Sequence, residues 1–95
     1  MSTTIQKTYY RNGQLRERVP VRNGRRHGVV RVWHKNGKRA SEEPFKDGLL
    51  DGVCRKWNEA GRRLGEYLMF QGTGLQREWH DNGKLQMEIW SICGE

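Results

Sequence analysis

The chain has 95 residues, with 18 Lys and Arg against 11 Asp and Glu and a formal net charge of +7. A chain of this length is one small domain, and no large core is available to it. Four Trp, three Tyr and two Phe exclude a disordered chain, and the lack of a long apolar run excludes a signal peptide and a membrane-spanning helix. We therefore expect a soluble, cytoplasmic protein.

The charge is unevenly distributed along the chain. Residues 1–39 hold eleven Lys and Arg and one acid, a net charge of +10, whereas residues 40–95 hold seven and ten, a net charge of −3. One end is therefore basic and the other mildly acidic. Cys54 and Cys93 provide neither a disulfide framework nor a metal-ligand spacing, and we expect inert thiols.

Glycine positions reveal an internal repeat of 24 residues that shortens to 22 near the end. Eleven of the twelve glycines fall on this lattice, and only Gly65 lies outside it. Aromatic and basic residues follow the same lattice, four and six residues ahead of one glycine of each unit. These columns are Gly13, Gly37, Gly61 and Gly83, then Tyr9, Trp33, Trp57 and Trp79, then Arg31, Arg55 and Arg77.

The first unit predicts a β-hairpin. Ile5, Lys7 and Tyr9 alternate with other residues at period two, which is typical of a strand. The following "RNG" at 11–13 predicts a hairpin turn, because both central residues of an Asn-Gly turn favour positive φ. Residues 15–21 alternate again and predict the return strand, and "NGRRHG" at 23–28 predicts a second glycine turn.

The same order recurs along the rest of the chain. Strands are predicted from residues 29, 53 and 75, with "KNG", "EAG" and "DNG" as first turns and "DGLLDG" and "GTG" as second turns. Helix is poorly supported, because glycine recurs too often. Proline cannot donate a hydrogen bond to a neighbouring strand, so we expect the sheet to be interrupted near Pro20 and Pro44.

The fold class that follows is all-β: an elongated single antiparallel sheet built from about four tandem β-hairpin repeats of 22–24 residues. Residues 1–95 form a single domain, with units at about 5–28, 29–52, 53–74 and 75–95, the last incomplete. An open sheet has two unpaired edges that must be covered or charged. We therefore expect burial against a partner, such as a second copy, a continuation of the array or a cognate protein.

The stretch "GVVRVWHKNGKRASEEPFKDGLLDGVCRKW" (28–57) resembles the MORN-type repeat, and the resemblance extends from about Thr8 to Gly94. It implies a row of β-hairpins in one sheet. It also implies scaffolding, protein contacts, self-association or contact with anionic phospholipid, and it implies no catalysis. Bacterial proteins of this kind are often described as antitoxin components of toxin–antitoxin pairs.

The aromatic column has two interpretations. Each unit contributes one large ring to a stacked core that no single hairpin could bury alone, or the rings form an exposed strip that stacks on nucleobases or a peptide. The repetition favours the first interpretation, because repeated apolar positions usually define the repeat itself.

The arginine column also has two interpretations. Glu42, Glu66 and Glu88 form a matching acidic column, with Arg18 in the equivalent first position. Pairing of Arg with Glu across neighbouring strands is the structural interpretation, and a stripe that binds anions is the functional one.

The basic first half supplies the candidate partner-binding residues. A cationic edge can meet nucleic acid, anionic lipid or an acidic protein, or it can simply keep a glycine-rich sheet soluble. No nucleic-acid recognition motif accompanies it. The candidate residues are Arg11, Arg16, Arg18, Arg22, Arg25 and Arg26.

Catalytic chemistry is poorly represented. His34 and His80 occupy equivalent positions just after a Trp, which indicates a structural role, and no nucleophile has a base beside it. We expect no cofactor, no metal and no small-molecule substrate. The leading hypothesis is a non-enzymatic scaffold or protein-interaction module, for which an antitoxin is one form. The alternative is electrostatic binding of anionic phospholipid or nucleic acid through the basic half.

Overall fold

The computed structural model describes residues 3–92, and these form one antiparallel sheet without helices. Cys93 and Gly94, named in the sequence analysis, lie outside the described residues. No helix with the length and apolar character of a membrane crossing occurs among residues 3–92. The strands are β1 Thr3–Tyr9, β2 Leu15–Arg22, β3 Arg25–Arg26, β4 Gly28–Trp33, β5 Arg39–Lys46, β6 Leu49–Leu50, β7 Gly52–Trp57, β8 Arg63–Phe70, β9 Thr73–Trp79 and β10 Leu85–Ser91.

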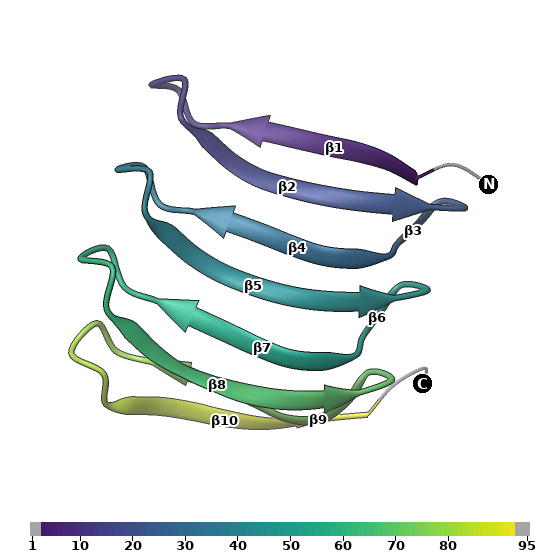
Figure 1. Cartoon of the computed structure of the whole chain (residues 1–95). Helices are drawn as coiled ribbons and strands as arrows, with labels where there is room; N and C mark the ends of the chain where they lie inside the picture. Colours follow the sequence, from purple (N-terminus) through teal and green to yellow (C-terminus); the bar gives the residue numbers. More distant parts are fainter. Residues whose placement is uncertain (1–2, 93–95) are drawn as a thin grey trace.

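The strands follow one another in the order β1-β2-β4-β5-β7-β8-β9-β10, with the two-residue β3 and β6 paired to β2 and β5. The turns after β1, β4 and β7 line one side of the sheet, and those after β2, β5 and β8 line the other (Figure 1). The result is a thin plate measuring 40 × 35 × 17 Å. The predicted antiparallel sheet of tandem hairpins is therefore confirmed.

The turns formed by "RNG", "KNG" and "DNG" do not have the predicted conformation. In those turns only the glycine has positive φ, for example 89° at Gly13, so the expected pair of positive φ values is wrong. The loop is longer than two residues, and the Asn12 Oδ1 stabilises it by accepting from the Gln14 N–H at 2.9 Å. Two successive positive φ values occur in the second turns instead, where Asn23, Asp47 and Gln71 precede a glycine.

The prolines do not interrupt the sheet. Pro20 is paired with Ile5 in β2, and Pro44 is paired with Val29 in β5. A Cβ at Gly52 would lie 2.9 Å from the Pro44 Cγ, so the glycine that begins β7 provides the space for the ring. The expectation of broken strands at these prolines is therefore wrong, because Gly28 and Gly52 leave space for the rings of Pro20 and Pro44.

The buried core lies on the side of the sheet that we call the core face. Its most buried side chains are those of Val19, Val30, Cys54, Tyr67 and Met69. The expected core of stacked Trp rings is not observed, since Trp33 and Trp57 are only half-buried and Tyr9 is 56% exposed. Val30 and Cys54 directly precede Arg31 and Arg55 of the Arg column, so strand alternation directs them to the opposite face.

The last hairpin, β9–β10, packs differently from the first three. β9 pairs with β8 through only two residue pairs, Met69–Gly74 and Phe70–Thr73. Trp79 then packs on the core face against Tyr67, with ring centroids 6.4 Å apart. The shortened "GTG" turn thus lets β9 leave the plane of β8 and cover the Cys54 and Met69 side chains.

Candidate functional surface

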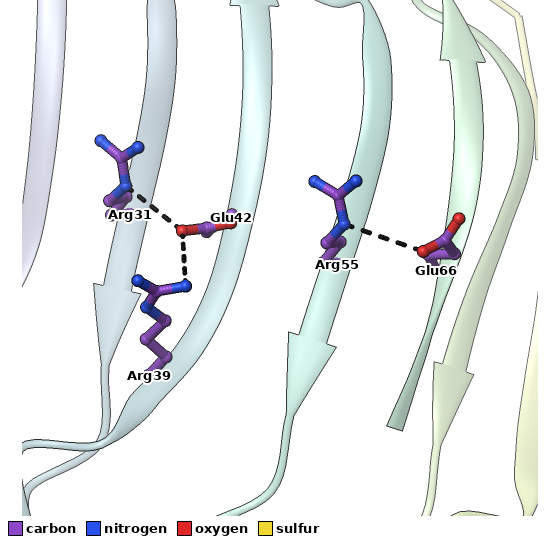
Figure 2. A network of polar contacts seen from close by, with 5 residues as sticks. All are labelled: Arg31, Arg39, Glu42, Arg55 and Glu66. Atoms are coloured by element: carbon purple, nitrogen blue, oxygen red, sulfur yellow. Dashed lines mark hydrogen bonds and ion pairs between the residues drawn. The ribbon is translucent and has the colours of Figure 1, made fainter. Parts of the chain in front are cut away.

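The face opposite the core carries the Arg and Glu columns, and we call it the ladder face. Arg31 is directly opposite Glu42 on the neighbouring strand, and Arg55 is opposite Glu66. The Nε–Oε distances are 3.3 Å for Arg31–Glu42 and 3.7 Å for Arg55–Glu66, and Figure 2 shows Arg39 reaching the same Glu42 carboxylate. Arg77 and Glu88 form the same pair at 2.9 Å, so the predicted pairing is present in three units.

The first unit lacks the acidic half of this arrangement. Arg18 is opposite Lys7 in β1 and opposite Arg31 in β4, so three cations follow one another across the sheet. Among residues 3–92, no carboxylate lies within ion-pair distance of Lys7 or Arg18. The basic character of the N-terminal half is therefore built into the ladder face itself.

The predicted partner-binding arginines do not form one cluster. Arg16 lies near the first turn, donating to Thr8 Oγ1 at 3.2 Å. Arg22 lies at the far end of the same strand, 4.0 Å from Asp47. Six residues of extended strand separate them by about 20 Å. Arg11 belongs to the first turn, Arg18 to the middle of β2, and Arg25 and Arg26 to β3 beside Arg22.

A hollow of about 410 Å³ lies on the ladder face across β4, β5 and β7. Pro44, Gly52 and the two valines give it apolar surface, while the Arg and Glu columns give it charge. Arg31 and Arg55 keep 41% and 42% of their side chains exposed there. Its lining residues are Val29, Arg31, Glu42, Pro44, Gly52, Val53 and Arg55.

Beyond this hollow the ladder face becomes apolar. Val53 is opposite Leu68, which is 66% exposed, and Phe70 on the same side of β8 is 69% exposed. Trp90 and Ile92 hold the corresponding positions after Glu88 and are 62% and 67% exposed. Leu68 and Phe70, which we call the apolar patch, are large enough and exposed enough to indicate a contact surface, whereas Trp90 and Ile92 expose apolar surface on the last hairpin, which leaves the plane of β8.

Sequence reasoning missed the apolar patch, although the repeat lattice carries the signal. Phe70 and Ile92 occupy the positions that Arg22 and Lys46 hold in the first two units. The same column of the ladder face therefore changes from cationic to apolar along the array. In addition, Leu68, Met69 and Phe70 are consecutive apolar residues, and a strand with one buried face must expose one side of such a run.

Side chains in the turns join each hairpin to the next. Tyr10 donates its hydroxyl to the Trp33 carbonyl at 2.6 Å, and the equivalent His34 Nε2 donates to the Trp57 carbonyl at 3.0 Å. The amide groups of Asn12, Asn36 and Asn58 donate to carbonyls 23 residues further on, at 3.2, 2.7 and 2.9 Å. The structural role expected for His34 is thus to hold neighbouring repeats in register.

Cys54 is placed unfavourably for nucleophilic chemistry. Its side chain is fully buried on the core face. Burial raises the pKa of the Cys54 thiol from 9.0 to about 11, and the negative charge of Glu43 also raises it. Burial likewise raises the pKa of Tyr67 far above its ordinary value. The thiolate is the reactive form, so Cys54 is chemically inert at neutral pH.

The described residues show no grouping of three His, Cys, Asp or Glu side chains that could hold a metal ion. The ladder face presents a charged hollow bordered by the exposed apolar patch. Side chains of Trp, Phe and Arg are also those enriched in protein interfaces.

Hairpins in register, each bonded to the next through its turns, define a tandem β-hairpin repeat protein in which a unit contacts chiefly its neighbours. Comparison with family models identifies which such repeat this is. The chain belongs to the MORN repeat variant family, whose model matches residues 3–23, 26–47 and 73–89. Repeats of this family are generally non-catalytic modules that bind proteins or membranes. Searches of curated proteins and of solved structures found no match.

The third hairpin, β7–β8, falls between the matched segments but has the same fold. Its turn has Ala60 where the other units have Asn, and Asn58 takes over that role. The Asn58 Oδ1 accepts from the Ala60 and Arg62 N–H groups at 3.0 and 2.9 Å, while its amide reaches the next hairpin. A different residue thus supplies the bonds that the family pattern places at Asn.

Proposed function

We propose that this chain is a cytoplasmic, non-enzymatic interaction module that docks a partner protein on the ladder face. The observation that carries the proposal is the apolar patch beside the charged hollow. Leu68 and Phe70 each expose more than three fifths of their surface. Removing such surface from water is favourable by about 25 cal/mol per Å².

The arrangement of the ladder face suits a protein partner. Stable protein interfaces have an apolar centre and a polar rim, and here the apolar patch adjoins the partly exposed Arg31 and Arg55. A partner with an apolar ridge and neighbouring carboxylates would complement both parts. A toxin neutralised by this chain is the specific partner that the resemblance suggests, because neutralisation requires binding and no chemistry by the antitoxin.

Quantitative affinity capture from the source cells tests the proposal. The bait pair is the wild-type chain and the double variant Leu68→Ser/Phe70→Ser, whose positions are both exposed, so that the fold should be retained. Leu49→Ser, at a residue only 36% exposed on β6, is the matched control. We expect a specific protein to be recovered by the wild type and the control and lost with the double variant. Equal recovery by all three baits contradicts the proposed surface.

A second candidate function is electrostatic binding of anionic phospholipid or nucleic acid. The observation that favours it is the row of Lys7, Arg18 and Arg31 on the ladder face, in which Lys7 and Arg18 have no carboxylate within ion-pair distance among residues 3–92. Binding of this kind falls steeply with salt. Charge reversal of Lys7 and Arg18 should abolish binding to phosphatidylserine vesicles or duplex DNA, and unchanged binding would eliminate this candidate.

A further inference from the structure

The two ends of the sheet carry complementary halves of the contact that joins one repeat to the next. β1 and β10 are the edge strands of the described sheet, at opposite ends of the strand order (Figure 1). Each edge leaves a row of backbone N–H and C=O groups without a strand partner among residues 3–92. The contacts between the internal repeats indicate which strand could pair with each edge.

Between internal hairpins the pairing has a fixed register. β5 and β7 are joined at Glu42–Arg55, and Pro44 and Val53 lie one step further along the same face of the two strands. By the repeat lattice, Glu88 and Trp90 of β10 correspond to Glu42 and Pro44. Lys7 and Ile5 of β1 correspond in the same way to Arg55 and Val53.

From this correspondence we propose that a second copy of this chain adds its β1 to β10, head to tail and antiparallel. In this register Glu88 faces the second copy's Lys7. The exposed Trp90, at 62%, faces the second copy's Ile5, at 37%. The proposal rests on the proposed interaction function, and it names a second copy of this chain as the partner of the β10 edge.

Charge complementarity selects this pairing over the alternatives. Lys7 adjoins Arg18 in a row without an acid, so an acidic neighbour on its open side is favourable. Glu88 already accepts from Arg77, and the internal Glu42 accepts from cations of two different residues, Arg31 and Arg39. Pairing of two β1 edges or two β10 edges in this register would place like charges opposite each other.

The turns carry the same complementarity. His34 and Asn36 donate to carbonyls of the next hairpin, but the equivalent His80 side chain and Asn82 amide group have no acceptor among residues 3–92. At the other end, the carbonyls of Tyr9 and Arg11 correspond to those of Trp33 and Lys35, which accept from Tyr10 and Asn12. A second copy placed head to tail would therefore supply two acceptors for two unused donors.

The test uses two charge reversals, Glu88→Lys and Lys7→Glu, in sedimentation equilibrium from micromolar to millimolar concentration. We expect the wild type to self-associate. Each single variant should self-associate more weakly, by about tenfold or more. An equimolar mixture of the two variants should associate again, because each Glu–Lys contact is then restored between different molecules. Glu78→Lys, an exposed residue of β9, is the control with the same change of charge, and it should associate like the wild type.

Three outcomes overturn the inference. A wild type that stays monomeric shows that nothing of this chain covers β10, without touching the proposed binding of another protein on the apolar patch. Association weakened by Glu88→Lys but not by Lys7→Glu indicates pairing of two β10 edges. Variants that remain monomeric when mixed show that Glu88 and Lys7 are not opposite each other.

Discussion

Gly65 lies beneath the indole ring of Trp79. A Cβ added at Gly65 would come within 2.7 Å of the Trp79 Cε2, which no real side chain tolerates. Gly65 is also the one glycine outside the repeat lattice, and the structure explains it: its φ is not in the left-handed region, so space for Trp79 is the reason for the glycine. The contact holds the last hairpin against the core face.

We predict that Gly65→Ala destabilises the protein by about 1–3 kcal/mol, the usual effect of overpacking. Backbone effects alone would make Gly65→Ala stabilising, because Ala in a strand is more stable than Gly by about 0.5–1 kcal/mol. Urea unfolding followed by tryptophan fluorescence measures the change. Ser41 holds the equivalent position in the second unit, so Ser41→Ala is the control and should have little effect. In a Trp79→Leu background the penalty at position 65 should disappear, and its persistence would mean that another contact is responsible.

We predict that Asn36→Asp lowers the free energy of unfolding by about 0.5–1.5 kcal/mol, the typical value of one hydrogen bond. The change keeps the Oδ1 acceptor for the Lys38 N–H and replaces the Nδ2 donor to the Glu59 carbonyl with a negatively charged oxygen. Asn82→Asp is the matched comparison. The Asn82 Oδ1 makes the same local bond to Lys84, but its Nδ2 has no acceptor among residues 3–92. Measured at a concentration where the chain is monomeric, equal losses at both positions would contradict a role for Asn36 in joining repeats.

We predict that Arg18→Glu stabilises the chain by about 0.5–1 kcal/mol. The new carboxylate would face Lys7 and Arg31, which copies the place of Glu42 in the second unit. Arg11→Glu changes the net charge equally at an exposed turn without a cross-strand partner, so the difference between the two variants isolates the ladder contact. Thermal unfolding at low salt measures it, and the difference should shrink at high salt. A less stable Arg18→Glu variant would show that the cationic row is needed for folding.

We predict that stability falls between pH 9 and about pH 11, in part through Cys54. Its pKa rises from 9.0 to about 11 on folding, so the folded state keeps a proton that the unfolded chain has lost. The stabilisation is complete below pH 9.0, the pKa of the thiol in the unfolded chain. It disappears as the pH passes about 11, the pKa of Cys54 in the folded state. Cys54→Val, which copies Val30 of the preceding unit, should flatten this part of the pH profile of the urea midpoint. Superimposable profiles would show that the thiol does not contribute.

The repeat, the strands and the Arg–Glu contacts could be predicted from the sequence because they depend on local spacing. A Trp four residues before a glycine, and a Glu one strand away from an Arg, keep their positions in each unit whatever the sheet packs against. The turn at Asn12 was harder, because Asn-Gly is compatible with two loop lengths and the longer one is chosen by the bond from Gln14 to the Asn12 side chain.

The core could not be predicted, because alternation identifies two faces without saying which is covered. Val30 and Cys54 form a column that continues with the polar Gln76, so it did not stand out as apolar. The burial of Cys54 involves the last hairpin, because Trp79 crosses to the core face, packs against the Cys54 cluster and covers Gly65, a tertiary contact that no local pattern contains. The apolar patch, by contrast, was readable from the lattice as the change from Lys46 to Phe70 in one column.

Photo-crosslinking inside the source cells tests the central claim most directly. A photoreactive phenylalanine analogue is placed at Phe70, in the apolar patch, or at Lys46, the same lattice position in the second unit, and crosslinked proteins are identified by mass spectrometry. The proposed function predicts a discrete adduct with one partner protein at position 70 and a weaker one or none at position 46. Crosslinks only to lipid or nucleic acid, or none at either position, would contradict docking of a protein on the apolar patch.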